Sequence, residues 1–429
     1  MVDNWNDVAS DISEAMRAWL QELTQITCSN TENNEDEVPK VLFVLDNDYG
    51  ELTTIMYLVS GQNYFRKSKV LLSARLYEKN KNILPQNIDL WTTEEDVLNS
   101  LKTYQPDVLV FAAGYLIPVH NLLTNEALER VCQAATDQKI QVVTADPFLG
   151  LVSEWSPKGL KEIISIDIPT GSNEHLIGLK RQADQKLHTE LAAANSFLRA
   201  FPHLYPTYTD MKGIAAFPSD EKNKSFFNEK LVIPAELQSL SSKDKPHWMF
   251  IISEVDFQTQ TMHVGAGKFV AMVWNLLTQG ANLGRKMIFL GPSALINMLR
   301  SMSTTPNENI CLFNFGAFDR VMSLLLTAEY TFYWNVVSHT ILIQLWNGKS
   351  VILFDKGHLA RSVSNLYERV IAWYYQGWEP NYFDQTQKIT LEGLADFVND
   401  HTKQKERLMK AYTRAPSPAA LFNSLLQVE

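Results

Sequence analysis

The feature that most constrains this chain is a regular alternation of short apolar runs with amphipathic stretches. Val41–Leu45 is a run of apolar residues, and the stretch after it carries apolar residues at helical spacing, at Leu52, Ile55, Met56 and Val59. Such a run is typical of a strand buried on both faces of a parallel sheet, and such a spacing is typical of a helix. Strands that alternate with helices of this length predict an α/β fold with a parallel sheet.

The alternation weakens after residue 150 and restarts at Trp248, while residues 201–245 are rich in Pro, Ser, Lys and Tyr and are expected to be irregular. We therefore predict two Rossmann-like domains whose parallel sheets face a cleft. The predicted organisation is an N-terminal helix and acidic linker at 1–38, a first domain at 39–245, and a second domain with terminal helices at 246–429.

The charge balance restricts the class of partner. The chain has 48 acidic and 38 basic residues and a formal net charge of −10. Nucleic-acid binding relies on Lys and Arg that neutralise phosphates, so this balance argues against a nucleic-acid partner. It is compatible with a small anion bound locally by a few basic groups and helix N-termini.

The cysteines and the N-terminus restrict the compartment. Cys28, Cys132 and Cys311 are too far apart in sequence for a metal or redox motif, and their odd number argues against a disulfide framework. The N-terminus lacks a basic stretch followed by an apolar run, and no apolar stretch approaches the ~18 residues that cross a bilayer. We expect a cytoplasmic protein without a secretory signal or a transmembrane segment.

Ser338, His339 and Thr340 lie between a strand expected at 330–337 and a helix expected at 341–346. Ligands of open α/β sheets bind at the carboxyl ends of the strands, and free backbone N–H groups at a helix start favour an anion. We predict that these three residues bind the diphosphate of a nucleotide. The simpler alternative is that Ser338 only caps the helix.

Gly265, Gly267 and Lys268 form a second candidate, in the sequence His-Val-Gly-Ala-Gly-Lys before a predicted helix. The two glycines would let the backbone approach a phosphate, and the lysine would supply charge. The Gly and Ser/Thr positions of a P-loop are missing, and an ordinary loop is the alternative.

A third group of candidates follows the apolar run at 351–354. Lys356 and Arg361, together with Arg285, would neutralise diphosphate charge, and Asp355 would accept a ribose or sugar hydroxyl. The alternative for the basic side chains is simple solvation.

Candidate catalytic residues follow the strands of the first half. Asp46 and Asp48 come after the first strand and His120 after the strand that ends at Gly114. A group transfer to a hydroxyl needs a base; Asp48 or Asp46 is the first choice and His120 the second. Ordinary turn chemistry also explains the aspartates. We expect no metal and no tightly bound cofactor, although Asp46-Asn47-Asp48 has Asp-X-Asp spacing.

The most specific pattern covers residues 318–359, where a helix leads to a strand, Ser338-His339-Thr340 opens the next helix and Gly348-Lys349-Ser350 leads into another strand. With two Rossmann-like halves around it, this stretch resembles the donor-binding half of GT-B nucleotide-sugar glycosyltransferases. The chain departs from that pattern at Gln344, where the family has Glu, and at Ser350, where it has Pro.

The resemblance implies that the second half binds a nucleotide-sugar, as co-substrate, and that the first half binds an acceptor that the sequence does not identify. The favoured function is a glycosyltransferase. Two alternatives remain open: a sugar-nucleotide epimerase of the same architecture, and a non-catalytic binding or assembly protein with a protein partner, which the Gln344 departure favours.

Overall fold

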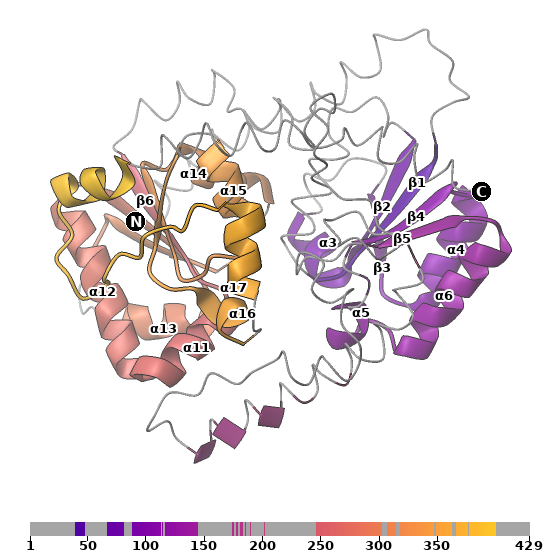
Figure 1. The fold of residues 1–429 in the computed structure, drawn as a ribbon, viewed down its shortest axis with the longest axis horizontal. Coiled ribbons are helices and arrows are strands. Elements are labelled where there is room, and N and C mark those ends of the chain that lie inside the picture. The colour runs from indigo at the N-terminus through magenta and orange to yellow at the C-terminus, as the bar shows by residue number, and fades with distance from the viewer. Residues whose placement is uncertain are drawn as a thin grey trace, which may run out of the picture. The chain divides into compact units, whose positions relative to one another are not determined.

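In the computed structural model, the described residues fall mainly between 39 and 144 and between 246 and 399 (Figure 1). The described residues are 39–47, 67–80, 88–112, 114, 116–144, scattered positions between 174 and 201, 246–302, 307–314, 318–346, 349–362, 366–375 and 377–399. The predicted N-terminal helix and acidic linker (1–38), the helix predicted around 52–59, and Asp48 lie outside the described residues.

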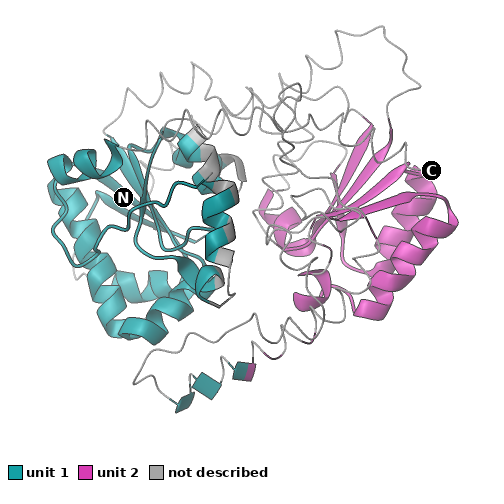
Figure 2. Cartoon of the chain, viewed as in Figure 1, with its two compact units in different colours: residues 1–18, 165–181, 229–409 teal, residues 19–164, 182–228, 410–429 magenta. Residues whose placement is uncertain are grey.

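The chain divides into two compact units, each of which contains one sheet (Figure 2). Unit 2 holds the five strands of the described residues up to Thr144, and unit 1 holds the five strands from His247 onward. All pairings in both sheets are parallel, so the predicted parallel α/β architecture is confirmed in each unit.

The sheet of unit 2 has the order β3-β2-β1-β4-β5. Its strands are β1 (Val41–Leu45), β2 (Ser68–Ser73), β3 (Ile88–Trp91), β4 (Val108–Ala112) and β5 (Gln141–Thr144). Every residue of β1 and β4 is buried, as a central strand covered on both faces requires. The described helices of this unit are α3 (Ala74–Asn80), α4 (Glu94–Tyr104), α5 (Leu116–Val119) and α6 (Asn125–Asp137).

Helices α4 and α6 pack side by side against one face of this sheet (Figure 1). The sequence sets the start of α4 locally, because Thr93 and Asp96 form a reciprocal capping box that satisfies two backbone N–H groups. The apolar side of α4 carries Val97 and Leu101, which are fully buried in the core of the unit.

The sheet of unit 1 has the order β10-β9-β6-β7-β8. Its strands are β6 (His247–Ile251), β7 (Lys286–Leu290), β8 (Ile310–Phe313), β9 (Tyr330–Tyr333) and β10 (Ser350–Leu353). A bridge from Leu353 to Tyr382 continues the pairing beyond β10. The core on one face is rich in aromatic rings; Phe250 stacks on Phe332 at 4.2 Å between centroids.

The helices of unit 1 include one that the sequence did not predict, α11 (Glu254–Val264). It lacks a clear apolar stripe, because the residues that it buries are Asp256, Phe257, Thr259 and Gln260. The other helices are α12 (Ala266–Asn282), α13 (Ser293–Ser301), α14 (Phe318–Thr327), α15 (His339–Trp346), α16 (Gly357–Ser362), α17 (Leu366–Arg369), the π-helical turn η4 (Val370–Tyr374) and a helix at 391–399.

The strand orders locate the ligand-binding edge of each sheet. In unit 2 the chain builds outward from β1 to β3 and then returns to place β4 on the other side of β1; in unit 1 it returns to place β9 on the other side of β6. The crevice outside the carboxyl ends of two such strands is the usual ligand position in an open α/β sheet. The described part of the chain contains no helix that is long and apolar enough to cross a membrane.

Candidate functional site

Asp46 and His120 meet at the switch point of the unit 2 sheet. Asp46 directly follows β1, and His120 follows the short helix α5 that comes after β4. His120 Nδ1 lies 2.9 Å from Asp46 Oδ2, with the Asp46 side chain fully buried and the His120 side chain 35% exposed. The structure therefore brings together two of the three residues predicted as candidate bases.

The backbone next to this pair is anchored by neighbouring strands. The Ser73 hydroxyl, at the end of β2, donates to the Asp46 carbonyl at 2.8 Å. An ionised Asp46 that accepts the Nδ1–H of His120 selects the tautomer in which Nε2 carries the lone pair. A buried carboxylate behind a partly exposed imidazole is an arrangement that can take a proton from a hydroxyl.

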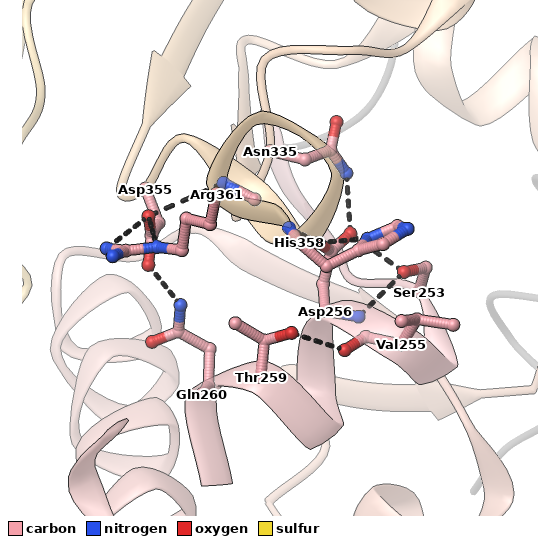
Figure 3. A network of polar contacts seen from close by, with 10 residues as sticks. Ser253, Val255, Asp256, Thr259, Gln260, Asn335, Asp355, His358 and Arg361 are labelled. Carbon is pink, nitrogen blue, oxygen red and sulfur yellow. Dashed lines mark hydrogen bonds and ion pairs between the residues drawn. The ribbon is translucent and has the colours of Figure 1, made fainter. Parts of the chain in front are cut away.

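A second carboxylate–imidazole pair lies at the switch point of unit 1 (Figure 3). Asp256, in the first turn of α11 after β6, is 1% exposed. Its Oδ1 accepts from the backbone N–H of His358 at 2.9 Å and lies 2.8 Å from His358 Nδ1. Its Oδ2 accepts from the Ser253 hydroxyl at 2.7 Å and from Asn335 Nδ2 at 2.9 Å.

These contacts fix the charge state of Asp256. Burial by itself raises the pKa of this carboxyl, but the charge that the His358 imidazole carries when it is protonated and the hydrogen bonds from His358 and Ser253 lower it by more. The pKa of Asp256 therefore lies below its usual value, and the group is an anion at neutral pH.

Sequence reasoning missed the Asp256 network. Ser253-x-x-Asp256 directly after an apolar run is a capping-box pattern, which would have signalled the start of α11. No short-range pattern signals that Asn335 and His358 converge on Asp256, since they are 79 and 102 residues away.

Gly357 is needed for the convergence of the strand ends in unit 1. Its φ of 84° lies in the left-handed region, and a Cβ built on it would overlap Cβ of Asn335. The missing side chain allows the start of α16 to approach the residue that follows β9, which places His358 on Asp256.

Asp355, Lys356 and Arg361 follow β10, as predicted. Arg361 Nε donates to Asp355 Oδ1 at 2.9 Å, and Gln260 Nε2 donates to Asp355 Oδ2 (Figure 3). Lys356 lies 3.8 Å from the centre of the Tyr367 ring and is exposed. Each oxygen of Asp355 thus has a protein donor, and the charge of Arg361 is balanced locally.

Ser338 and Thr340 lie where the sequence placed them, at the start of α15. Their hydroxyl oxygens are 2.7 Å apart, and the hydroxyl oxygen of Tyr333, at the end of β9, lies 3.1 Å from Thr340 Oγ1. The side chain of His339 is outside the described residues. The strand before them, predicted to reach residue 337, ends at Tyr333.

Gln344, which stands where the resembled family has Glu, is fully buried. Its Nε2 donates to the Leu325 carbonyl at 2.9 Å and to Thr331 Oγ1 at 2.5 Å. Its Oε1 accepts from the Tyr333 hydroxyl at 3.1 Å. The amide is a fully bonded core group, and two of its three bonds need a donor that a carboxylate does not have.

The Gly-Ala-Gly-Lys segment joins α11 to α12 and does not directly follow a strand. Gly265 ends α11 with a φ of 85°, and Lys268 is an exposed residue in the first turn of α12. Arg285 lies near the amino end of β7, opposite the ligand-binding edge, and forms two hydrogen bonds with Glu329. The candidates that follow β9 and β10 therefore lie at the carboxyl edge of the unit 1 sheet, whereas Arg285 lies at the amino edge.

Within the residues that the structure describes, no group of three or more His, Cys, Asp or Glu side chains could hold a metal ion. The described cysteines, Cys132 and Cys311, are free and buried. Burial raises the pKa of the Cys311 thiol to about 11 despite the charge of Lys286, so this thiol is not a nucleophile at neutral pH.

Comparison with protein-family models and with curated proteins finds no match. Among solved structures, UDP-GlcNAc 2-epimerase from Neisseria meningitidis, bound to UDP-GlcNAc, matches at 13% identity with a TM-score of 0.43, over 90% of this chain and 97% of that chain. Medicago truncatula UGT71G1, complexed with UDP-glucose, matches at 10% identity with a TM-score of 0.45, over 90% and 98%.

MurG from Acinetobacter baumannii also matches, at 10% identity with a TM-score of 0.38, over 90% of this chain and 98% of that chain. The likeness in all three comparisons concerns the fold alone.

Proposed function

We propose that this chain is a glycosyltransferase that moves a sugar from a nucleotide-sugar co-substrate to a hydroxyl of an acceptor. The observation that carries the proposal is the Asp46–His120 pair, a buried carboxylate 2.9 Å from an imidazole at the switch point of the unit 2 sheet. His120 would take the proton of the acceptor hydroxyl, and Asp46 would hold the imidazole in the required tautomer and stabilise its charged form.

The proposed donor site is the carboxyl edge of the unit 1 sheet. Ser338 and Thr340 supply hydroxyls at the start of α15, and Lys356 supplies an exposed positive charge after β10. These groups, together with Arg361, His339 and the segment Gly265–Lys268, remain our candidates for the diphosphate. The leaving diphosphate would be stabilised by such donors, without a tightly bound metal.

The first experiment is a thermal-shift screen of the full chain against UDP, GDP, ADP, CMP and dTDP and their sugar conjugates. A ligand at about 100 times its Kd adds ~2.7 kcal/mol of stability, which is easily detected. The nucleotide-sugar that stabilises the protein is then the donor for transfer assays with a panel of hydroxyl acceptors. If no nucleotide or nucleotide-sugar shifts the unfolding temperature, the proposed function is wrong.

The catalytic part of the proposal is tested by His120→Ala and Asp46→Asn. Loss of a general base lowers kcat by about 10²- to 10⁴-fold, so both variants should lose transfer while they keep donor binding. Gln133→Ala, an exposed position on α6, is the matched control in the same unit and should retain activity. Full activity of His120→Ala would remove this residue from the reaction.

A second candidate is a non-catalytic nucleotide-binding or assembly protein. It is favoured by Gln344, whose burial removes from the ligand edge the position that the resembled family fills with Glu, and by the Asp355–Arg361 pair, whose charges are satisfied within the protein. Binding without turnover, unchanged by His120→Ala, would support it. An epimerase would instead convert the nucleotide-sugar without any acceptor, which product analysis detects.

A further inference from the structure

We propose that His358 is a second hydrogen-bond-accepting imidazole, held by Asp256, that binds a hydroxyl group of a sugar or ribose at the switch point of the unit 1 sheet. The ligand class rests on the proposed function, since the hydroxyl would belong to the nucleotide-sugar. The role of the imidazole rests on geometry that the proposed function does not use.

The position of the pair supports a ligand-binding role. Asp256 follows β6, Asn335 follows β9 and His358 follows β10, so three neighbouring strands deliver one residue each to the same carboxyl edge (Figure 3). The crevice between β6 and β9 is where the direction of sheet growth changes. The same construction, an aspartate on a histidine Nδ1, occupies the corresponding crevice of unit 2.

The hydrogen bonds determine which atom of His358 can meet a ligand. Asp256 accepts bonds from four donors: the Ser253 hydroxyl, Asn335 Nδ2, and the backbone N–H and Nδ1–H of His358. A carboxylate with this set of donors keeps the proton of the neutral imidazole on Nδ1. In this neutral form Nε2 carries a lone pair and accepts a hydrogen bond from an O–H or N–H group.

Two acceptors at this site lack a donor among the described residues. His358 Nε2 has no hydrogen bond in the described part of the chain, and the His358 side chain is 26% exposed. Asn335 Oδ1 is buried and has no hydrogen-bond partner among the described residues, while Nδ2 of the same amide donates to Asp256. A buried acceptor without a donor is unfavourable, as at Asn335 Oδ1, and the partly exposed His358 ring presents a second acceptor to a ligand that carries donors.

Hydroxyl groups fit these atoms better than a phosphate does. A phosphate offers only acceptors at neutral pH, and it would face two further acceptors and the buried charge of Asp256. A polyhydroxyl ligand offers several donors at adjacent carbons and no charge. The two sources of such groups in a nucleotide-sugar are the ribose and the transferred sugar.

The test uses His358→Asn in the full chain. Asn keeps a side-chain amide near the position of Nδ1, which can still donate to Asp256, and removes the atom that would meet the ligand. Gln258→Ala, an exposed position on the same helix as Asp256, is the matched control. Thermal unfolding of both variants checks that the unit remains folded.

Isothermal titration with UDP and UDP-glucose, and with GDP and GDP-mannose, then identifies the source of the hydroxyl. The loss of one such hydrogen bond should weaken binding by about tenfold. Weaker binding of the sugar conjugate alone assigns His358 to the transferred sugar, and equally weaker binding of the diphosphate assigns it to the ribose. Unchanged affinity for both ligands of a pair that the wild type binds overturns the proposal.

A second measurement does not depend on the donor. The ¹⁵N shifts of the His358 ring, assigned by comparison with His358→Asn and recorded at a pH where the ring is neutral, should show the Nδ1–H tautomer in the free protein. The Nε2–H tautomer would overturn the inference whatever the screen finds. If the wild type binds no nucleotide, the proposed function falls, and the tautomer alone decides whether His358 is the acceptor that we infer.

Discussion

Replacement of Gln344 by Glu tests whether this position belongs to the core or to the ligand site. In the structure the amide donates to the Leu325 carbonyl and to Thr331, and accepts from Tyr333. An ionised Glu has no donor for the Leu325 carbonyl and would place a negative charge at a fully buried position. The folded chain must therefore hold the introduced carboxyl as the neutral acid, or unfold.

The size of the effect follows from the cost of protonation. A free Glu side chain has a pKa of ~4.3, and each pH unit above that value adds about 1.4 kcal/mol to the cost of keeping the acid neutral. Gln344→Glu should therefore lose about 4 kcal/mol of unfolding free energy at pH 7 and about 1 kcal/mol at pH 5, before the loss of the bond to Thr331. The sign is that of a carboxyl whose pKa is raised in the folded state, so the destabilisation grows as the pH rises.

The assay is urea denaturation of the wild type and of the variant at pH 5, 6 and 7. Gln344→Met is the control, because it removes the same hydrogen bonds without a titrating group and should cost about 1–3 kcal/mol at every pH. A Gln344→Glu variant that is as stable as the wild type at pH 7 would refute the reasoning. If this variant instead bound nucleotide-sugar more tightly, position 344 would face the ligand, as in the resembled family.

Three further predictions test the framework of unit 1. Gly357→Ala should lower the unfolding temperature by several degrees, because its Cβ would overlap Asn335 and its φ is positive; a fully stable variant would show that the strand ends need no such approach. Arg285→Ala should cost about 1–2 kcal/mol in urea denaturation, because Glu329 loses both hydrogen bonds from Arg285 and keeps the one from Trp248 Nε1, and it should not change nucleotide affinity. Asp256 has a pKa below its usual value, so its contribution to the free energy of unfolding is present above the unfolded-state pKa of ~3.9 and is lost as the pH falls through the folded-state pKa. The free energy of unfolding of Asp256→Asn should therefore fall less steeply between pH 5 and pH 3 than that of the wild type. An equal slope in the two proteins would contradict this.

The strands of both sheets were predictable because their signal is local. Each central strand is a short run of apolar residues such as Val41–Leu45, and burial on both faces of a parallel sheet demands just such a run. The helix α11 was not predictable in the same way. It buries Asp256, Thr259 and Gln260, and residues distant in sequence bond the side chains of Asp256 and Gln260, so no apolar period marks it.

The candidate sites show the same difference between features that local sequence marks and features that depend on distant residues. The sequence alone determined that Asp46 and His120 each follow a strand of one parallel sheet, because chain order and apolar patterning fix which residues leave the carboxyl ends. It also named Asp355, Lys356 and Arg361 for that reason.

Only the tertiary structure decided which of these residues meet. The strand order places β4 beside β1, which brings His120 onto Asp46 across 74 residues, and it places β9 and β10 so that Asn335 and His358 reach Asp256. It also turned Gln344 inward and paired Arg361 with Asp355. Hydrogen bonds between distant residues depend on where strands lie in the sheet, and local sequence patterns carry no information about that order.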